Sequence, residues 1–139
     1  PMPRATLLER AATCDLGLSF MPTTSPNFNE VTMAGASNKA FEYLACGVPI
    51  LVSDMPDWQR MFVEPGVAFA AAPGDIASLT RILRHAMEHR TELAAMGETG
   101  QELIAREWNY ETQFGRVLEE IERQSGASKL PKSADERVR

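Results

Sequence analysis

Three short apolar runs, each too short for a typical helix, constrain the fold of this chain more than any other feature. The runs are LGLSFM (residues 16–21), VPILV (residues 48–52) and VAFA (residues 67–70). Stretches with the apolar spacing of helices separate and follow them. Because buried strands joined by helices form parallel sheets with right-handed crossovers, the sequence predicts an α/β fold. We expect a partial Rossmann-like unit of about three parallel strands with flanking helices.

The helical stretches differ in how strongly the sequence marks them. Pro73-Gly74-Asp75 opens the clearest one, in which Ile76, Leu79, Ile82, Leu83 and Met87 share one face. Further helices are predicted over residues 4–12, 37–46, 55–62, 91–108 and 110–123. Residues 23–36 are rich in Pro, Asn, Ser, Thr and Gly. Such a stretch is long for a structureless connection, which favours a functional loop.

Three strands correspond to one half of a doubly wound nucleotide-binding domain, which normally has about six. In the strand order 3-2-1-4-5-6, the three runs would be strands four, five and six, adjacent to one another. Residues 16–21 would then form an edge strand that is either open or covered by a partner. Since an unpaired apolar edge promotes association, we expect dimers or higher oligomers through this edge.

The segment SNKAFEYLACGVPILVSD (residues 37–54) contains the candidate site. A helix capped by Ser37 follows the small residues Gly35 and Ala36, so its free backbone N–H groups and positive dipole end can bind an anion. Asn38 and Lys39 add a neutral donor and a cation to the first turn. The Glu42 carboxylate lies one turn on, within reach of Lys39, and can accept both hydroxyls of a ribose whose phosphates rest at the helix start. The residues fit equally well an exposed helix with a Lys–Glu pair.

The same segment resembles the C-terminal nucleotide-binding domain of group 1-type, GT-B-fold glycosyltransferases. The resemblance continues in ATCDLGL (residues 12–18), in Pro73-Gly74-Asp75 and in the stretch from Met96-Gly97 to Trp108-Asn109. It implies that residues 1–125 form the C-terminal half of a nucleotide-sugar-binding domain. Residues 126–139, which lack periodicity, are expected to be a disordered tail.

Carried over to this chain, the resemblance assigns Glu42 to the donor ribose and residues 35–39 (Gly35, Ala36, Ser37, Asn38 and Lys39) to the diphosphate. Many members carry a further glutamate eight positions before the ribose glutamate, where this chain has Ala34. Glu30 lies in the same loop at a different spacing. The contact to the transferred sugar is therefore unassigned, and no catalytic residue is identified.

The implied function is transfer of a hexose from a nucleoside diphosphate sugar to a sugar hydroxyl, with retention of configuration and without a cofactor or an obligatory metal. A missing N-terminal domain would supply the acceptor site, so this chain alone is expected to be inactive. Two other interpretations stay open. One is a GT-B-fold epimerase of nucleotide sugars, and the other is a non-catalytic α/β interaction module.

The net charge and the cysteine content limit the classes of partner that the chain can have. The net charge of −5 argues against nucleic acid as a partner, because phosphate binding needs clustered Lys and Arg. Cys14 and Cys46 are expected to be reduced, core-facing thiols.

Without a membrane span or a signal peptide, the expected location is the cytoplasm, with a peripheral position at the inner membrane face as a variant. HAMEH (residues 85–89) matches an inverted zinc-protease motif, but the helical wheel turns His85 toward solvent, so no metal is expected.

Overall fold

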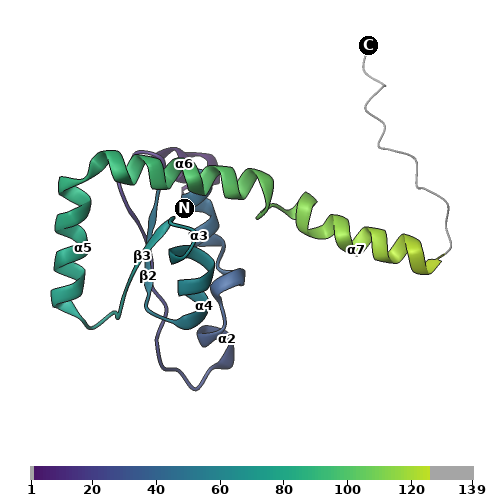
Figure 1. Cartoon of the computed structure of the whole chain (residues 1–139), viewed down its shortest axis with the longest axis horizontal. Helices are drawn as coiled ribbons and strands as arrows, with labels where there is room; N and C mark the ends of the chain where they lie inside the picture. Colours follow the sequence, from purple (N-terminus) through teal and green to yellow (C-terminus); the bar gives the residue numbers. More distant parts are fainter. Residues whose placement is uncertain (1, 126–139) are drawn as a thin grey trace, which may run out of the picture.

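A computed structural model describes residues 2–125 of the 139-residue chain (Figure 1). In chain order the elements are α1 (Arg4–Ala11), β1 (Gly17–Ser19), α2 (Phe28–Val31), a 3-10 turn (Ala34–Ala36), α3 (Asn38–Ala45), β2 (Ile50–Ser53), α4 (Pro56–Trp58), a π-helical turn (Gln59–Val63), β3 (Ala68–Ala71), α5 (Ile76–Glu88), α6 (Arg90–Arg106) and α7 (Tyr110–Ser125). The expected tail over residues 126–139 lies outside the described residues.

The three strands form one parallel sheet in the order β1-β2-β3. In the register, Leu18 is opposite Leu51, and Leu51 is opposite Phe69. Every residue of β2 is buried, as expected for a central parallel strand covered on both faces. Figure 1 shows α5 on one side of the strands and α3 and α4 on the other, with α6 across one end. The predicted α/β class, the parallel pairing and the adjacency of the three strands are confirmed.

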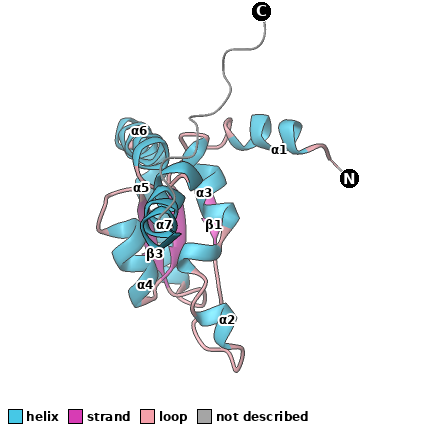
Figure 2. Cartoon of the chain, turned by 90° about the vertical axis from the view of Figure 1, so that its right-hand side faces the viewer, coloured by secondary structure: helices cyan, strands magenta, loops and turns pink. Residues whose placement is uncertain are grey.

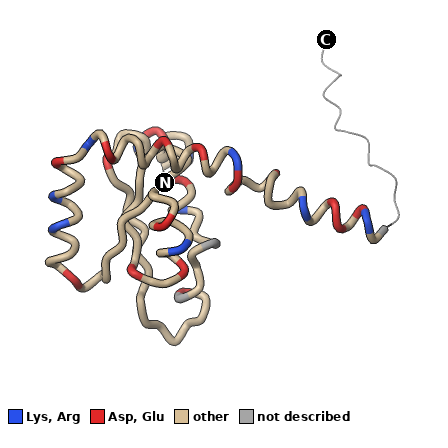
Figure 3. Tube along the Cα trace, in the orientation of Figure 1, with Lys and Arg blue, Asp and Glu red and all other residues tan. Residues whose placement is uncertain are grey.

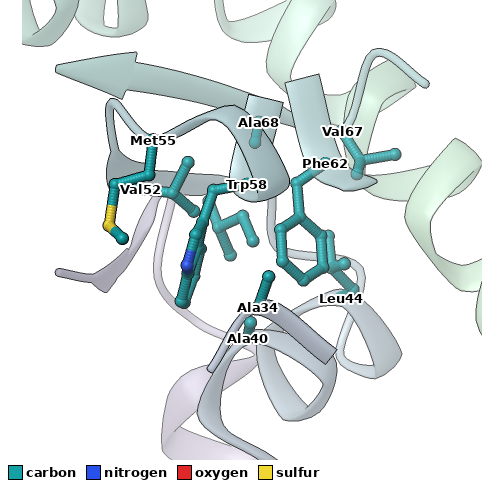
Figure 4. Close-up of a cluster of buried hydrophobic side chains, with 10 residues drawn as sticks. Ala34, Ala40, Leu44, Val52, Met55, Trp58, Phe62, Val67 and Ala68 are labelled. Carbon is teal, nitrogen blue, oxygen red and sulfur yellow. The ribbon is translucent and has the colours of Figure 1, made fainter. Parts of the chain in front are cut away.

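The core lies between the sheet and the helices α3 and α4 (Figure 4). Trp58 and Phe62 are fully buried in it, with ring centroids 5.4 Å apart. Phe41 and Trp108 pack edge-on against Phe62, at centroid distances of 5.7 Å for each ring. This aromatic cluster connects α3 to the residues that follow α6.

Helix α3 ends where α6 crosses it. The N–H of Gly47 donates to the Leu44 carbonyl and the N–H of Val48 to the Tyr43 carbonyl, which is a Schellman motif. Gly47 has a φ of 74°, in the left-handed region that glycine adopts without strain. A Cβ on Gly97 of α6 would lie 2.0 Å from the Gly47 carbonyl oxygen. Glycine at both positions, Gly47 after α3 and Gly97 in α6, is what allows the two helices to approach so closely.

The predicted loop over residues 23–36 contains more structure than expected. It folds into α2 and into the 3-10 turn Ala34–Ala36. The Asn27 side chain accepts from the N–H of Asn29 and begins α2, because asparagine is a strong helix cap. Ala34 is buried against the core. Short helical elements thus order the loop at its tip and at its end, and its predicted functional role stays a prediction.

Helix α5 begins at the predicted cap, since the Asp75 side chain accepts from the N–H of Ser78 at 3.0 Å. Its apolar face is only partly covered: Ile76 and Met87 are exposed, whereas Ala86 is buried. The reason is that α5 packs on β3, an edge strand of the sheet, which covers only part of the helix. His85 does not face solvent as the wheel suggests, because its ring packs edge-on against Phe69 of β3.

The two ends of the described chain lie apart from the core. Helix α1 lies on the side of β1 and α3 (Figure 2), and α7 extends away from the body (Figure 1). Acidic and basic positions are interspersed along α5, α6 and α7 (Figure 3). Residues 2–125 contain no helix long and apolar enough to cross a membrane.

We expect self-association through the β1 edge at millimolar concentration. Leu18, in the middle of this edge strand, is 50% exposed, and unpaired apolar strand edges recruit a second strand. In sedimentation equilibrium the chain should form dimers or larger species, and Leu18→Lys should shift the equilibrium toward monomer. Phe28→Lys on α2 is the matched control, since Phe28 is equally apolar and 75% exposed. A monomeric wild-type chain, or equal effects of both substitutions, would contradict the prediction.

Candidate functional site

The candidate site begins where the chain leaves β1 and returns to start α3. The hydroxyl of Ser53, at the end of β2, donates to the Met21 carbonyl at 2.6 Å and accepts from the Met21 N–H at 2.7 Å. Ser53 is fully buried, so this pair of bonds fixes the exit from β1 to the neighbouring strand. The loop that follows ends in the turn containing Gly35 and Ala36, directly before α3.

The first turn of α3 presents backbone N–H donors that are not capped by the side chain of Ser37. Ser37 has the backbone conformation of a cap, but its side chain makes no capping hydrogen bond, so the predicted capping by Ser37 is wrong. The N–H of Ala40 donates to the Ser37 carbonyl, at 3.2 Å. The N–H groups of Asn38 and Lys39, at the start of the helix, have no acceptor within the helix itself, and the Ser37 side chain does not supply one. These two N–H donors and the positive end of the helix dipole can therefore bind an anion.

Glu42 lies one turn further along α3 and is paired with a residue the sequence does not suggest. Arg4 of α1 donates to Glu42 Oε1 from Nη2 at 2.8 Å and from Nε at 3.2 Å. The expected pairing with Lys39 is not formed in the described structure. The Glu42 side chain is 32% exposed and that of Arg4 is 74% exposed. Glu42 thus remains accessible while one of its oxygens is engaged.

Two hollows flank Glu42. One, of about 260 Å³, lies between α1 and α3 and is lined by Lys39, Glu42 and apolar side chains of α1. The other, of about 320 Å³, is lined by Arg4, Asn38, Phe41, Glu42 and Trp108, among others. Glu42 is therefore shared by both hollows, and the structure brings it together with Asn38 on one side and with Lys39 on the other.

The position of the missing glutamate is filled by a packing residue. Ala34 is 5% exposed and contributes to the core beside Trp58 (Figure 4). Glu30, the other acidic residue of the loop, accepts from the Ser25 hydroxyl at 2.6 Å and from the Asn27 amide at 3.5 Å. Its carboxylate therefore stabilises α2 and the loop locally, and the loop offers no replacement for the absent glutamate.

Both cysteines are free thiols. Cys14 is exposed, which corrects the expectation that it faces the core, and Cys46 is half-buried at the end of α3. Burial, and then the negative charge of Glu42, raise the pKa of the Cys46 thiol. The carboxylate thus acts on the far end of its own helix as well as on Arg4.

We expect Cys46 to react with iodoacetamide more slowly than Cys14, because a raised pKa lowers the thiolate fraction at a given pH. Glu42→Gln removes the negative charge, so the pKa of Cys46 should fall and its alkylation should become faster. Peptide mass spectrometry after labelling at about pH 8, close to the ordinary pKa of a thiol, measures both rates. Glu9→Gln on α1 is the control. An unchanged Cys46 rate in Glu42→Gln would show that the two groups do not interact.

The histidine motif forms a small cluster at the corner between α5 and α6. The rings of His85 and His89 are stacked at 4.1 Å, and His85 Nε2 lies 2.9 Å from Glu92 Oε2. Residues 2–125 contain no group of three or more His, Cys, Asp or Glu side chains arranged to hold a metal ion. The cluster instead links the two helices by ring stacking, by the hydrogen bond between His85 and Glu92, and by a second one from His89 Nδ1 to the His85 carbonyl at 2.9 Å.

Two contacts at the site were missed by sequence reasoning, and only one of them has a sequence signal. Arg4 reaches Glu42 across 38 positions, and no local pattern in α1 marks it. The Tyr43 ring lies against Gly17 of β1, where a Cβ on the glycine would come within 2.4 Å of the ring. A glycine inside a strand run does signal close approach of another group, so this second contact was open to prediction.

Comparison with known proteins gives one match. A family model described as glycosyl transferase-like matches residues 2–119, which is most of the chain and includes every candidate site residue. No curated protein and no solved structure matches the chain significantly.

Proposed function

The chain belongs to the glycosyl transferase-like family, and we propose that it supplies donor-binding contacts in a nucleotide-sugar-dependent glycosyltransferase. Proteins of this kind use a sugar donor and an acceptor. The family match gives no support to the epimerase or to the non-catalytic module. The proposed reaction is transfer of a hexose from a nucleoside diphosphate sugar to a sugar hydroxyl, with retention as the family resemblance implies.

The observation that carries this proposal is the uncapped start of α3. A helix start normally has its first N–H groups met by a side chain such as Ser, yet Ser37 does not serve this purpose. The N–H groups of Asn38 and Lys39 are then available to the diphosphate, and the Lys39 ammonium adds a positive charge beside them. Ala36 is exposed and its side chain is a single methyl group, which suits the approach of phosphate oxygens to the backbone.

Glu42 would hold the ribose of the same nucleotide. Its carboxylate lies one helical turn from the N–H donors, on the same helix, and it remains accessible to solvent. An ionised carboxylate only accepts hydrogen bonds, which suits the hydroxyl donors of a ribose. Together the helix start and Glu42 match the order of groups along a nucleoside diphosphate.

We further propose that residues 1–125 are the C-terminal half of a GT-B nucleotide-sugar-binding domain. The strand order β1-β2-β3 with β1 at an edge supports this, because the first half would continue the sheet beyond β1. The acceptor site and the reaction centre would come from that half and from an N-terminal domain, in the cytoplasm or at the inner membrane face. The chain by itself would then bind donor weakly and transfer no sugar.

Chemical-shift mapping of the chain tests the proposed function. Adenosine, guanosine and uridine diphosphates are added one at a time to the labelled chain, followed by the corresponding nucleosides. We expect at least one diphosphate to shift the amide signals of residues 36–40, and the nucleosides to shift them far less. Absence of any shift at the start of α3, or shifts confined to another surface, would contradict the proposal.

A further inference from the structure

The ion pair between Arg4 and Glu42 is asymmetric. Both guanidinium N–H groups end on the same carboxylate oxygen, Oε1, at 2.8 and 3.2 Å. An ionised carboxylate has about two acceptor directions on each oxygen, so Oε1 is fully used. Oε2 accepts no hydrogen bond from any residue in the described part of the chain.

This asymmetry limits what Glu42 can recognise. A carboxylate that grips both hydroxyls of a ribose uses one oxygen for each hydroxyl. With Oε1 occupied by Arg4, Oε2 is the oxygen left for the nucleotide. We propose that Arg4 is a specificity-determining residue that restricts Glu42 to a single ribose hydroxyl, an inference that rests on the proposed function.

Arg4 is expected to keep its place when the nucleotide binds. Displacing it would exchange two N–H bonds between oppositely charged groups for one bond to the carboxylate from a neutral hydroxyl, while Oε2 already offers the hydroxyl an acceptor. Helix α1, which carries Arg4, is also held against α3 through the Cys46 thiol, which contacts the Leu8 carbonyl at 3.7 Å. Leu7 and Leu8 of α1 and Tyr43 of α3 line the apolar hollow between the two helices, so apolar side chains of both helices face each other near the pair.

The test compares deoxy analogues in two forms of the chain. The nucleoside diphosphate that binds most tightly is titrated by NMR, together with its 2′-deoxy and 3′-deoxy analogues. In the wild-type chain we expect one analogue to bind about tenfold or more weakly, as for a lost bond to a charged acceptor, and the other to bind as the parent nucleotide does. In Arg4→Ala, Oε1 becomes free, so both analogues should be weakened.

The controls separate this inference from the proposed function. Arg10→Ala removes the same charge from α1, and the Arg10 side chain makes no hydrogen bond or ion pair with a described residue, so it should keep the wild-type pattern. Equal weakening of both analogues in the wild-type chain, or an unchanged pattern in Arg4→Ala, overturns the role of Arg4 while leaving Glu42 as the ribose ligand. If Glu42→Ala binds the nucleotide as well as the wild type does, the ribose assignment fails, and the role of Arg4 fails with it.

Discussion

Replacing Gly97 by alanine is expected to destabilise the fold by about 3 kcal/mol, at the upper end of the usual cost of overpacking. The new methyl group would lie 2.0 Å from the Gly47 carbonyl oxygen. Because that oxygen belongs to the backbone at the end of α3, it cannot rotate away as a side chain would. Helices α3 and α6 must therefore move apart, which disturbs the aromatic contacts around Phe62. Urea unfolding followed by tryptophan fluorescence measures the change in free energy.

Alanine substitutions at two further glycines, Gly100 and Gly115, serve as comparisons for Gly97→Ala. At Gly100 the nearest atom to a new Cβ is Leu44 Cδ2, at 2.9 Å, which is the end of a flexible side chain, so Gly100→Ala should cost less. At Gly115 of α7 nothing lies within 4 Å, and alanine there should stabilise the helix by up to about 1 kcal/mol. Equal effects of Gly97→Ala and Gly115→Ala would show that the close crossing of α3 and α6 does not exist.

Glu42→Ala is expected to weaken binding of a nucleoside diphosphate by roughly 10- to 150-fold, equivalent to about 1.5–3 kcal/mol for hydrogen bonds to a charged acceptor. The ribose hydroxyl would lose its carboxylate partner, while the diphosphate contacts at the start of α3 would remain. Folding should change little, because the Glu42–Arg4 pair is exposed and such pairs contribute at most about 1 kcal/mol. Titration of the wild-type chain and the variant gives the ratio of dissociation constants.

Glu42→Gln and Glu111→Ala complete this series. Glutamine keeps the shape and one acceptor oxygen, so it should lose less affinity than alanine does. Glu111 is an exposed glutamate of α7, and its removal makes the same change in net charge away from the site. If Glu111→Ala weakened binding as much as Glu42→Ala does, the effect would reflect overall charge and not a ribose contact.

The fold was predictable from the sequence to a large extent because burial leaves a local signature. The apolar run at residues 48–52 lies over β2, whose residues are all buried, and such continuous runs are typical of central parallel strands. The observed strands are shorter at several ends, with β1 limited to Gly17–Ser19. The ends of an edge strand depend on which neighbour pairs with it, and a single sequence does not contain that information.

The site was predictable only where its residues are neighbours in sequence. The position at which α3 begins and the glycine that ends it follow local helix rules, and the structure shows both, although the Ser37 side chain does not form the expected cap. The partner of Glu42 is different, since Arg4 meets it only after α1 packs on α3. In the same way, the orientation of His85 toward Phe69 depends on how far the sheet extends beneath α5. Contacts made by tertiary packing of exposed polar side chains leave no periodic signal to read.

A crystal structure of the chain with a bound nucleoside diphosphate hexose tests the central claim most directly. The claim is that the start of α3 and Glu42 together hold the donor nucleotide. We predict that diphosphate oxygens accept from the backbone N–H groups of Asn38 and Lys39, and that a ribose hydroxyl donates to Glu42 Oε2 while Arg4 stays on Oε1. A nucleotide bound on another surface, or one whose ribose points away from Glu42, would contradict the claim.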